Sequence, residues 1–180
     1  MDTTPHLTNG SVNGDLEHAN GNGASPSDAS SSTELSDFVK KIFSKHFVLT
    51  LCEFKRLFGL HLAEVPAGQV VVQSMSDFML QDAILQNACR QIHVPFPSQT
   101  KLAADEQKVF CLWETGNDSD KLRHVLFELF SKNYRIKRTM LQSKLSEEVG
   151  EIPKTDIDRL LKECCISSSG MWYLKGTCPS

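Results

Sequence analysis

The chain has 180 residues and carries 19 Lys and Arg against 22 Asp and Glu, a formal net charge of -3 at pH 7. This balance excludes proteins that bind nucleic acid through a large excess of positive charge. Hydrophobic residues make up 40% of the chain, enough for a buried core. No apolar run approaches the roughly 20 residues of a membrane-spanning helix, so we expect no membrane partner.

The N-terminus and the cysteines indicate the compartment. No basic stretch precedes an apolar one, and residues 1–32 contain no arginine, so we expect neither a signal peptide nor a mitochondrial presequence. The six cysteines include no CxxC pair and are expected to be reduced and mostly buried. We therefore expect a soluble protein of the nucleus or the cytoplasm.

Residues 1–32 lack Lys, Arg and aromatic residues and are rich in Ser, Thr, Asn, Gly and Asp. Such a segment buries too little apolar surface to offset its loss of chain entropy, so we expect a disordered tail. A solvated leader is its simplest role. A phosphorylation site at Ser25-Pro26 is an alternative that rests on one dipeptide.

The chain from residue 33 to residue 116 follows the order helix, short strand, two helices and hairpin. Ser31 with Glu34 and Thr50 with Glu53 have capping-box spacing, so the first helix is expected to begin near Ser31 and the second after Thr50. The third helix is expected from about Ser76 to Cys89, and the hairpin ends near Trp113. The side chains at helical spacing that we expect to face inward are Leu35, Phe38, Val39, Ile42, Phe43, Leu51, Phe54, Leu57, Phe58, Leu80, Ile84, Leu85 and Ala88.

The pattern then starts again at a constant offset, since Leu122 lies 87 positions after Leu35 and Phe130 lies 87 after Phe43. Thr139 and Gln142 again have capping-box spacing. A helix over residues 154–165 and a hairpin that turns at residues 168–170 complete the second copy. We therefore expect a mainly α protein with small β hairpins, an α+β fold, with tandem winged-helix domains at residues 33–116 and 117–180.

Several segments carry a specific resemblance that spans roughly residues 34–177. They are Val94-Pro95-Phe96-Pro97, Asp105-Glu106-Gln107-Lys108-Val109-Phe110, Leu112-Trp113-Glu114, Phe130-Ser131-Lys132-Asn133-Tyr134-Arg135 and Gly170-Met171-Trp172-Tyr173-Leu174-Lys175-Gly176-Thr177. In number and order they resemble the C-terminus of the animal RNA polymerase III subunit of the TFIIF-like heterodimer. The resemblance implies a non-catalytic subunit with an array of winged helices, with other polymerase III subunits as partners, in the nucleus.

The sequence departs from that family in two respects. The family subunit is several times longer, and its N-terminal half carries a barrel-like dimerisation module that nothing here resembles. The final Cys178-Pro179-Ser180 also differs from the family's ending. We therefore expect a fragment, a short form or a related protein without that module.

One segment is a candidate contact surface: Lys132, Arg135, Lys137 and Arg138 lie within seven residues, with Tyr134 among them. A basic run with an aromatic residue can bind a nucleic-acid backbone or an acidic protein. The alternative is that the ring packs inward while the cations lie on an ordinary surface. All three interpretations stay open at this point.

Recognition of DNA by the third helix of either copy is not expected. A winged helix reads the major groove with that helix, and Arg and Lys hold the phosphates. The first copy carries Asp77 and Asp82 there and no Lys or Arg before Arg90. In the second copy, acidic and basic residues balance. At most, weak and non-specific nucleic-acid contact is expected.

We expect no catalytic residue, metal site, cofactor or small-molecule substrate. Cys164 shares the apolar helical stripe, where a thiol is inert, and no histidine is near it in sequence. No Cys or His pair has the spacing of a zinc ligand cluster. Trp113 and Trp172 end hairpins that we expect to be equivalent, which favours core anchors over ligand-stacking residues. The sequence thus predicts a protein-interaction scaffold, with a nucleic-acid-binding module as the alternative.

Overall fold

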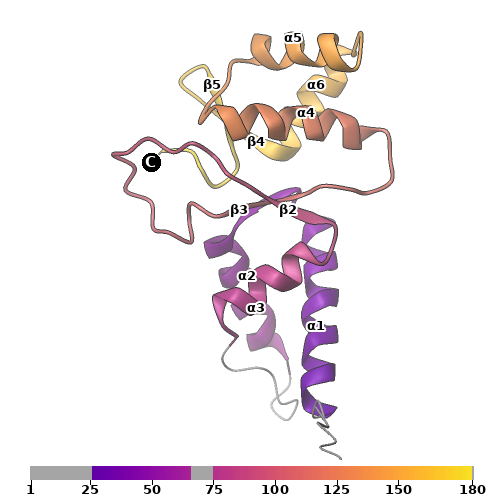
Figure 1. The fold of residues 1–180 in the computed structure, drawn as a ribbon, viewed down its shortest axis with the longest axis vertical. Helices are drawn as coiled ribbons and strands as arrows, with labels where there is room; N and C mark the ends of the chain where they lie inside the picture. Colours follow the sequence, from indigo (N-terminus) through magenta and orange to yellow (C-terminus); the bar gives the residue numbers. More distant parts are fainter. Residues whose placement is uncertain (1–25, 66–74, 180) are drawn as a thin grey trace, which may run out of the picture.

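The computed structural model of the protein describes residues 26–65 and 75–179. In these residues six helices and two small antiparallel sheets alternate, which confirms the expected α+β class (Figure 1). No helix among them has the length and apolar character needed to cross a bilayer.

The elements fall into two repeats of similar order. The first repeat comprises α1 (Pro26–Phe43), β1 (Val48–Thr50), α2 (Leu51–Glu64), α3 (Asp77–Leu85), β2 (Cys89–Ile92) and β3 (Val109–Leu112). The second repeat comprises α4 (Ser119–Lys132), α5 (Arg138–Glu148), α6 (Lys154–Cys164), β4 (Cys165–Ser168) and β5 (Met171–Leu174).

The first helix begins earlier than the sequence predicted. Helix α1 starts at Pro26, so residues 26–32, which we assigned to a disordered tail, are helical. Proline suits the first helical position because it has no backbone N–H to leave unpaired. The rest of the expected tail, and the Ser25 half of the phosphorylation alternative, lie outside the described residues.

The cap predicted at Thr50 is confirmed, whereas the capping box predicted at Ser31 and Glu34 is wrong, because both residues lie inside α1. Thr50 Oγ1 accepts a hydrogen bond from the Glu53 amide at 3.2 Å, and Ser76 caps α3 in the same way. Helix α5 begins at Arg138 after Lys137, which makes no side-chain cap, so the capping box expected at Thr139 is wrong. There the chain enters the helix directly from an extended residue.

Helix α3 also ends earlier than expected. It stops at Leu85, and Ala88 adopts a positive φ of 59°, which a continuous helix does not allow. Leu80 and Ile84 are buried as predicted, but Leu85 is 47% exposed and Ala88 is exposed too. The two inward assignments at the end of α3 are therefore wrong, because the chain turns before those residues can reach the core.

Both faces of the three-stranded sheet are covered. The strand order is β1-β3-β2. Successive side chains of β3 point to opposite faces of the sheet, with Phe110 in one core cluster and Cys111 in the other. One face packs with α1, α2 and α3, while the other belongs to the same core cluster as α4 residues Leu126 and Phe130. Figure 1 accordingly shows α4 lying across the sheet from the helices of the first repeat. The two repeats share one core cluster through this sheet.

The structural equivalence of the repeats follows the predicted offset. Ile136 pairs with Trp172 in an isolated antiparallel bridge, and Leu49, 87 positions before Ile136, pairs with Phe110. Trp172 is therefore equivalent to Phe110. Trp113 comes directly after β3 and is not equivalent to Trp172, so the expected match of the two tryptophans is wrong. The equivalence depends on the register of strand pairing. The sequence does not reveal that register, because a long loop separates β2 from β3.

The second hairpin turns as predicted. Ser169 and Gly170 connect β4 to β5 with φ angles of 51° and 74°. Two central residues with positive φ are the signature of the turn whose twist matches that of the flanking strands. Cys165 opens this hairpin opposite Leu174, just as Cys89 opens the first opposite Leu112.

Candidate partner-binding surface

The basic segment of the second repeat lies where α4 passes into α5. Lys132 is the last residue of α4, Arg138 is the first of α5, and the residues between them run alongside β5. The backbone of Ile136 exchanges two hydrogen bonds with Trp172, at 3.0 and 2.8 Å. This pairing gives the segment a fixed extended conformation.

Neighbouring groups engage three of the four cations. Lys132 pairs with Glu128 at 2.7 Å, and Arg138 pairs with Asp158 of α6. A hydrogen bond with the Tyr173 side chain raises the pKa of Arg135. Among the described residues no ion pair is found for Lys137, which is exposed.

Tyr134 points into the protein and does not stand among the cations as a stacking platform. Its ring contacts Tyr173 edge-on at 5.3 Å and Phe96 at 5.5 Å, and its hydroxyl donates to the Thr177 carbonyl at 2.8 Å. Burial raises the pKa of this phenol. The geometry favours the interpretation in which the ring packs inward, because a ring held at both ends has no free face for a base.

The third helices of the two repeats present different outward faces. In α6 the exposed residues include Arg159 and Lys162, and Arg159 pairs with Asp156 at 3.0 Å. In α3 the exposed side chains include Phe78 and Met79, and the helix has no Lys or Arg. Neither face concentrates positive charge for phosphates.

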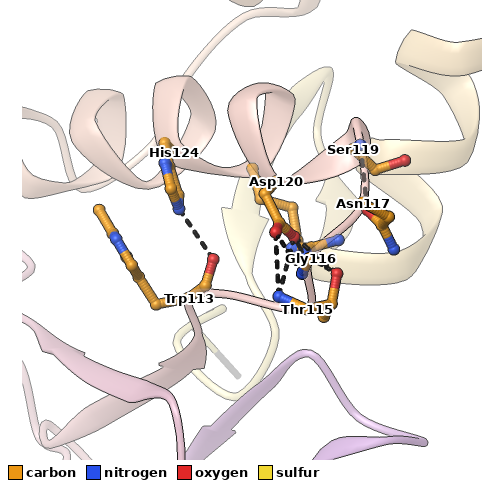
Figure 2. A network of polar contacts seen from close by, with 8 residues as sticks. Trp113, Thr115, Gly116, Asn117, Ser119, Asp120 and His124 are labelled. Atoms are coloured by element: carbon orange, nitrogen blue, oxygen red, sulfur yellow. Dashed lines mark hydrogen bonds and ion pairs between the residues drawn. The ribbon is translucent and has the colours of Figure 1, made fainter.

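A polar network at the junction of the repeats was not predicted. Asp120 accepts hydrogen bonds from the backbone of Thr115 and Gly116 and from the Thr115 hydroxyl, as Figure 2 shows. Burial would raise the pKa of Asp120, but these bonds and the nearby Arg123 lower it to about 2. The network anchors the N-terminal turn of α4 to the segment that follows β3.

Arg123 is the buried partner in this network. Its side chain is 2% exposed, pairs with Asp120, donates to the Thr115 hydroxyl at 3.1 Å and lies 5.0 Å from the centre of the Phe47 ring. Its position one residue after Leu122 on an amphipathic helix gave a weak signal at best. A charged residue is buried only when its partners are at hand, and these come from three separate segments.

Trp113 sits between an arginine and a histidine. His124 stacks on it at 4.1 Å and donates through Nε2 to the Trp113 carbonyl at 2.8 Å, because a carbonyl oxygen only accepts (Figure 2). The Arg90 guanidinium covers the ring at 4.3 Å. Trp113 and Trp172 are both half-buried at the margin of the core cluster and are not enclosed within it.

The buried thiols are poor nucleophiles. Cys164 and Cys165 are buried, as expected for Cys164, and burial raises the pKa of Cys164 to about 12 and that of Cys165 well above its usual value. Cys111 lies near both, and burial likewise raises the pKa of its thiol well above the usual value. In the described part of the chain, no group of His, Cys, Asp and Glu side chains is arranged to hold a metal ion.

Two open clefts interrupt the surface. One of about 590 Å³ lies between α1 and α2 and is lined by Glu34, Asp37 and His61 among others. The other, of about 360 Å³, lies between β1 and the C-terminal hairpin, with Ile166 and Lys175 on its wall. Titratable side chains line both clefts, including Lys41 in the first and His46 and Cys52 in the second, but both are open to solvent and neither forms an enclosed pocket.

The comparison with known families decides what the chain is. A family model described as DNA-directed RNA polymerase III subunit RPC5 C-terminal matches residues 1–180. The chain belongs to this family. It is 56% identical to the human DNA-directed RNA polymerase III subunit RPC5 over 148 residues, and 55% identical to the mouse subunit.

Membership of the RPC5 C-terminal family confirms the resemblance drawn from the sequence. The match covers 82% of this chain but only 21% of each relative, so the chain spans about a fifth of the length of the curated relatives it matches. Transcription by RNA polymerase III is therefore the context of the family, and both relatives are named as subunits of that polymerase.

Proposed function

We propose that this chain is a non-catalytic protein-interaction module of the nuclear RNA polymerase III machinery. It docks through tandem winged-helix domains at residues 33–116 and 117–180, the first extended at its N-terminus by the start of α1. Membership of the RPC5 C-terminal family carries the proposal. The twofold order of helix, strand, two helices and hairpin supports the winged-helix assignment.

The charge distribution supports docking to protein over docking to nucleic acid. Lys132 and Arg138 are paired with acidic side chains, and Tyr134 is packed inward. Base recognition in the major groove usually relies on Arg or Lys of the third helix, and α3 has neither. Nucleic-acid binding through the second repeat stays the alternative, since Arg159, Lys162 and Lys137 are exposed.

Affinity purification of the tagged chain from nuclear extract, with and without nuclease, tests the proposal. We expect subunits of RNA polymerase III to be enriched equally in both samples, because protein contacts do not depend on nucleic acid. Enrichment that nuclease abolishes would support the alternative. Absence of polymerase subunits from both samples would contradict the proposal.

A further inference from the structure

Helix α3 exposes large apolar side chains on one face. Phe78 is 76% exposed, Met79 50% and Leu85 47%, and Asp82 lies between them along the helix. We call these four residues the α3 face. Single exposed apolar residues are ordinary, but here Phe78 and Leu85, seven residues apart, lie on the same side of the helix, and Met79 flanks them on its outward face.

The second repeat shows that the fold does not require this patch. The N-caps Ser76 and Pro153 are equivalent, and from them Leu80 matches Ile157 and Ile84 matches Leu161, all four buried. Counting from the same caps, the positions of Phe78, Asp82 and Leu85 are occupied in α6 by residues that are all polar and exposed, Thr155, Arg159 and Lys162. The apolar residues of the α3 face therefore contribute something other than packing within the chain.

The charge on the α3 face restricts what can cover it. Asp82 is exposed and accepts a hydrogen bond from Gln86 at 2.7 Å, and no ion pair to it is found in the described residues. A second copy packed symmetrically would place Asp82 near its own equivalent, and nucleic acid or anionic lipid would meet the same negative charge. A partner with positive charge beside apolar side chains is complementary.

The spacing of the α3 face fits a helix. Phe78 and Leu85 are seven residues apart, which is about 10 Å along the axis at 1.5 Å per residue. A partner helix with apolar residues at i, i+3, i+4 and i+7 presents a stripe of the same length. We infer that the α3 face docks an amphipathic protein helix that carries Lys or Arg beside its apolar stripe.

This inference rests on the proposed role as an interaction module, and it names the surface and the chemistry of the partner. Its test uses two synthetic peptides with identical leucine spacing at i, i+3, i+4 and i+7, one with Lys and one with Glu at the polar positions. The full chain, labelled with ¹⁵N, is titrated with each by NMR. We expect the Lys peptide to shift the amide resonances of α3. The Glu peptide should bind more weakly by a factor of about ten or more.

A repeat swap supplies the matched variants. Phe78→Thr, Asp82→Arg and Leu85→Lys together give α3 the polar residues of α6, and the reciprocal Thr155→Phe, Arg159→Asp and Lys162→Leu give α6 the α3 face. All six positions are exposed, so both triple variants should fold, which the dispersion of the amide spectrum checks. We expect the first variant to lose binding about tenfold or more and the second to gain shifts at α6.

Three results would overturn the inference: no binding of the Lys peptide to α3, equal binding of both peptides, or binding unchanged by the α3 swap. The polymerase purification distinguishes these failures from failure of the proposed function. If the α3 swap variant still enriches polymerase subunits as well as the wild type, the proposed function stands and the α3 face is not its docking surface. If the wild type enriches none while the peptide binds α3, the proposed function is the one that fails.

Discussion

Gly176 packs so closely against Thr50 that a Cβ atom on the glycine would lie 2.8 Å from Thr50 Cγ2. Gly176 follows β5 at the end of the second repeat, and Thr50 caps α2 in the first. The next residue, Thr177, is fully buried, and its carbonyl accepts the Tyr134 hydroxyl. The C-terminal segment thus joins the two repeats at a second place, apart from the sheet and α4.

Substitution of Gly176 measures this contact. Gly176→Ala meets both a positive φ of 82° and the overlap with Thr50, so we expect a loss of about 2–4 kcal/mol in the free energy of unfolding. Gly170→Ala is the control, because its φ is 74° with nothing within 4 Å, and it should cost about 1–2 kcal/mol. Urea denaturation of both variants gives the difference. Equal losses would mean that the Thr50 contact contributes nothing.

Asp120 should make stability depend on pH in the acid range. Its folded pKa of about 2 lies below the ordinary value of 3.8, so the charged form stabilises the fold. This charge contributes about 2 kcal/mol to the free energy of unfolding. The contribution is complete above about pH 4–5 and is lost as the pH falls from 3.8 toward 2. We expect Asp120→Asn to remove this contribution and to flatten the acid part of the stability profile. Urea denaturation between about pH 2 and about pH 7 measures it.

Glu128→Gln provides the matched control for Asp120. Glu128 pairs with Lys132 on the exposed face of the same helix, and its carboxylate is 49% exposed. Exposed pairs contribute little to stability, so we expect no resolvable change. An equal effect of the two substitutions would show that the junction network has no special weight.

The shared core predicts a single unfolding transition. Val109 and Cys111 of β3 belong to the same buried cluster as Leu126 and Phe130 of α4. Removing either repeat would expose one side of this cluster to water, so the two should unfold together. We expect urea curves from Trp113 fluorescence in a Trp172→Phe variant to coincide with curves from far-UV circular dichroism. Two separate transitions would show that the repeats are independent.

Trp172 and Phe110 should differ in what they contribute. From the sequence alone, Trp172→Ala is expected to cost about 3–5 kcal/mol as a buried anchor. The structure leaves Trp172 half-buried, whereas the equivalent Phe110 is fully enclosed. We now expect about 2–3 kcal/mol for Trp172→Ala and about 3–5 kcal/mol for Phe110→Ala, measured by urea denaturation. A larger loss at Trp172 would contradict this order.

The chain should not bind duplex DNA sequence-specifically. If all four of Lys132, Arg135, Lys137 and Arg138 met phosphates, log K would change with log salt by about -3.6. Lys132 and Arg138 are paired with acidic side chains, so only Arg135 and Lys137 keep a charge that no carboxylate neutralises among the described residues. We therefore expect weak binding with a slope of about -1.8 or shallower. Fluorescence anisotropy with a randomised duplex library measures both. Enrichment of one sequence at sub-micromolar affinity would overturn the scaffold interpretation.

The sequence by itself determined the order of the elements and much of their internal geometry. The cap at Thr50 and the turn at Ser169-Gly170 were predictable because each depends on residues within a few positions of one another. The 87-residue offset between Leu35 and Leu122 also holds for Leu49 and Ile136, the paired residues of the two short extended segments. Patterns of this kind are local, or are repeated copies of local patterns, and so they are legible in one chain.

The tertiary structure alone decided what each surface meets. The periodicity marked Val109 and Cys111 as apolar but did not reveal that α4 covers their side of the sheet. In sequence the basic segment is a cluster of cations with no acidic residue among them. In the structure Arg138 pairs with Asp158, twenty positions away. Asp120 is a local partner of Arg123 on the same helix, but the Phe47 ring that also contacts Arg123 comes from the first repeat and is brought there only by the fold. Burial and charge pairing are properties of distances in space, and sequence spacing does not fix those distances beyond a single element.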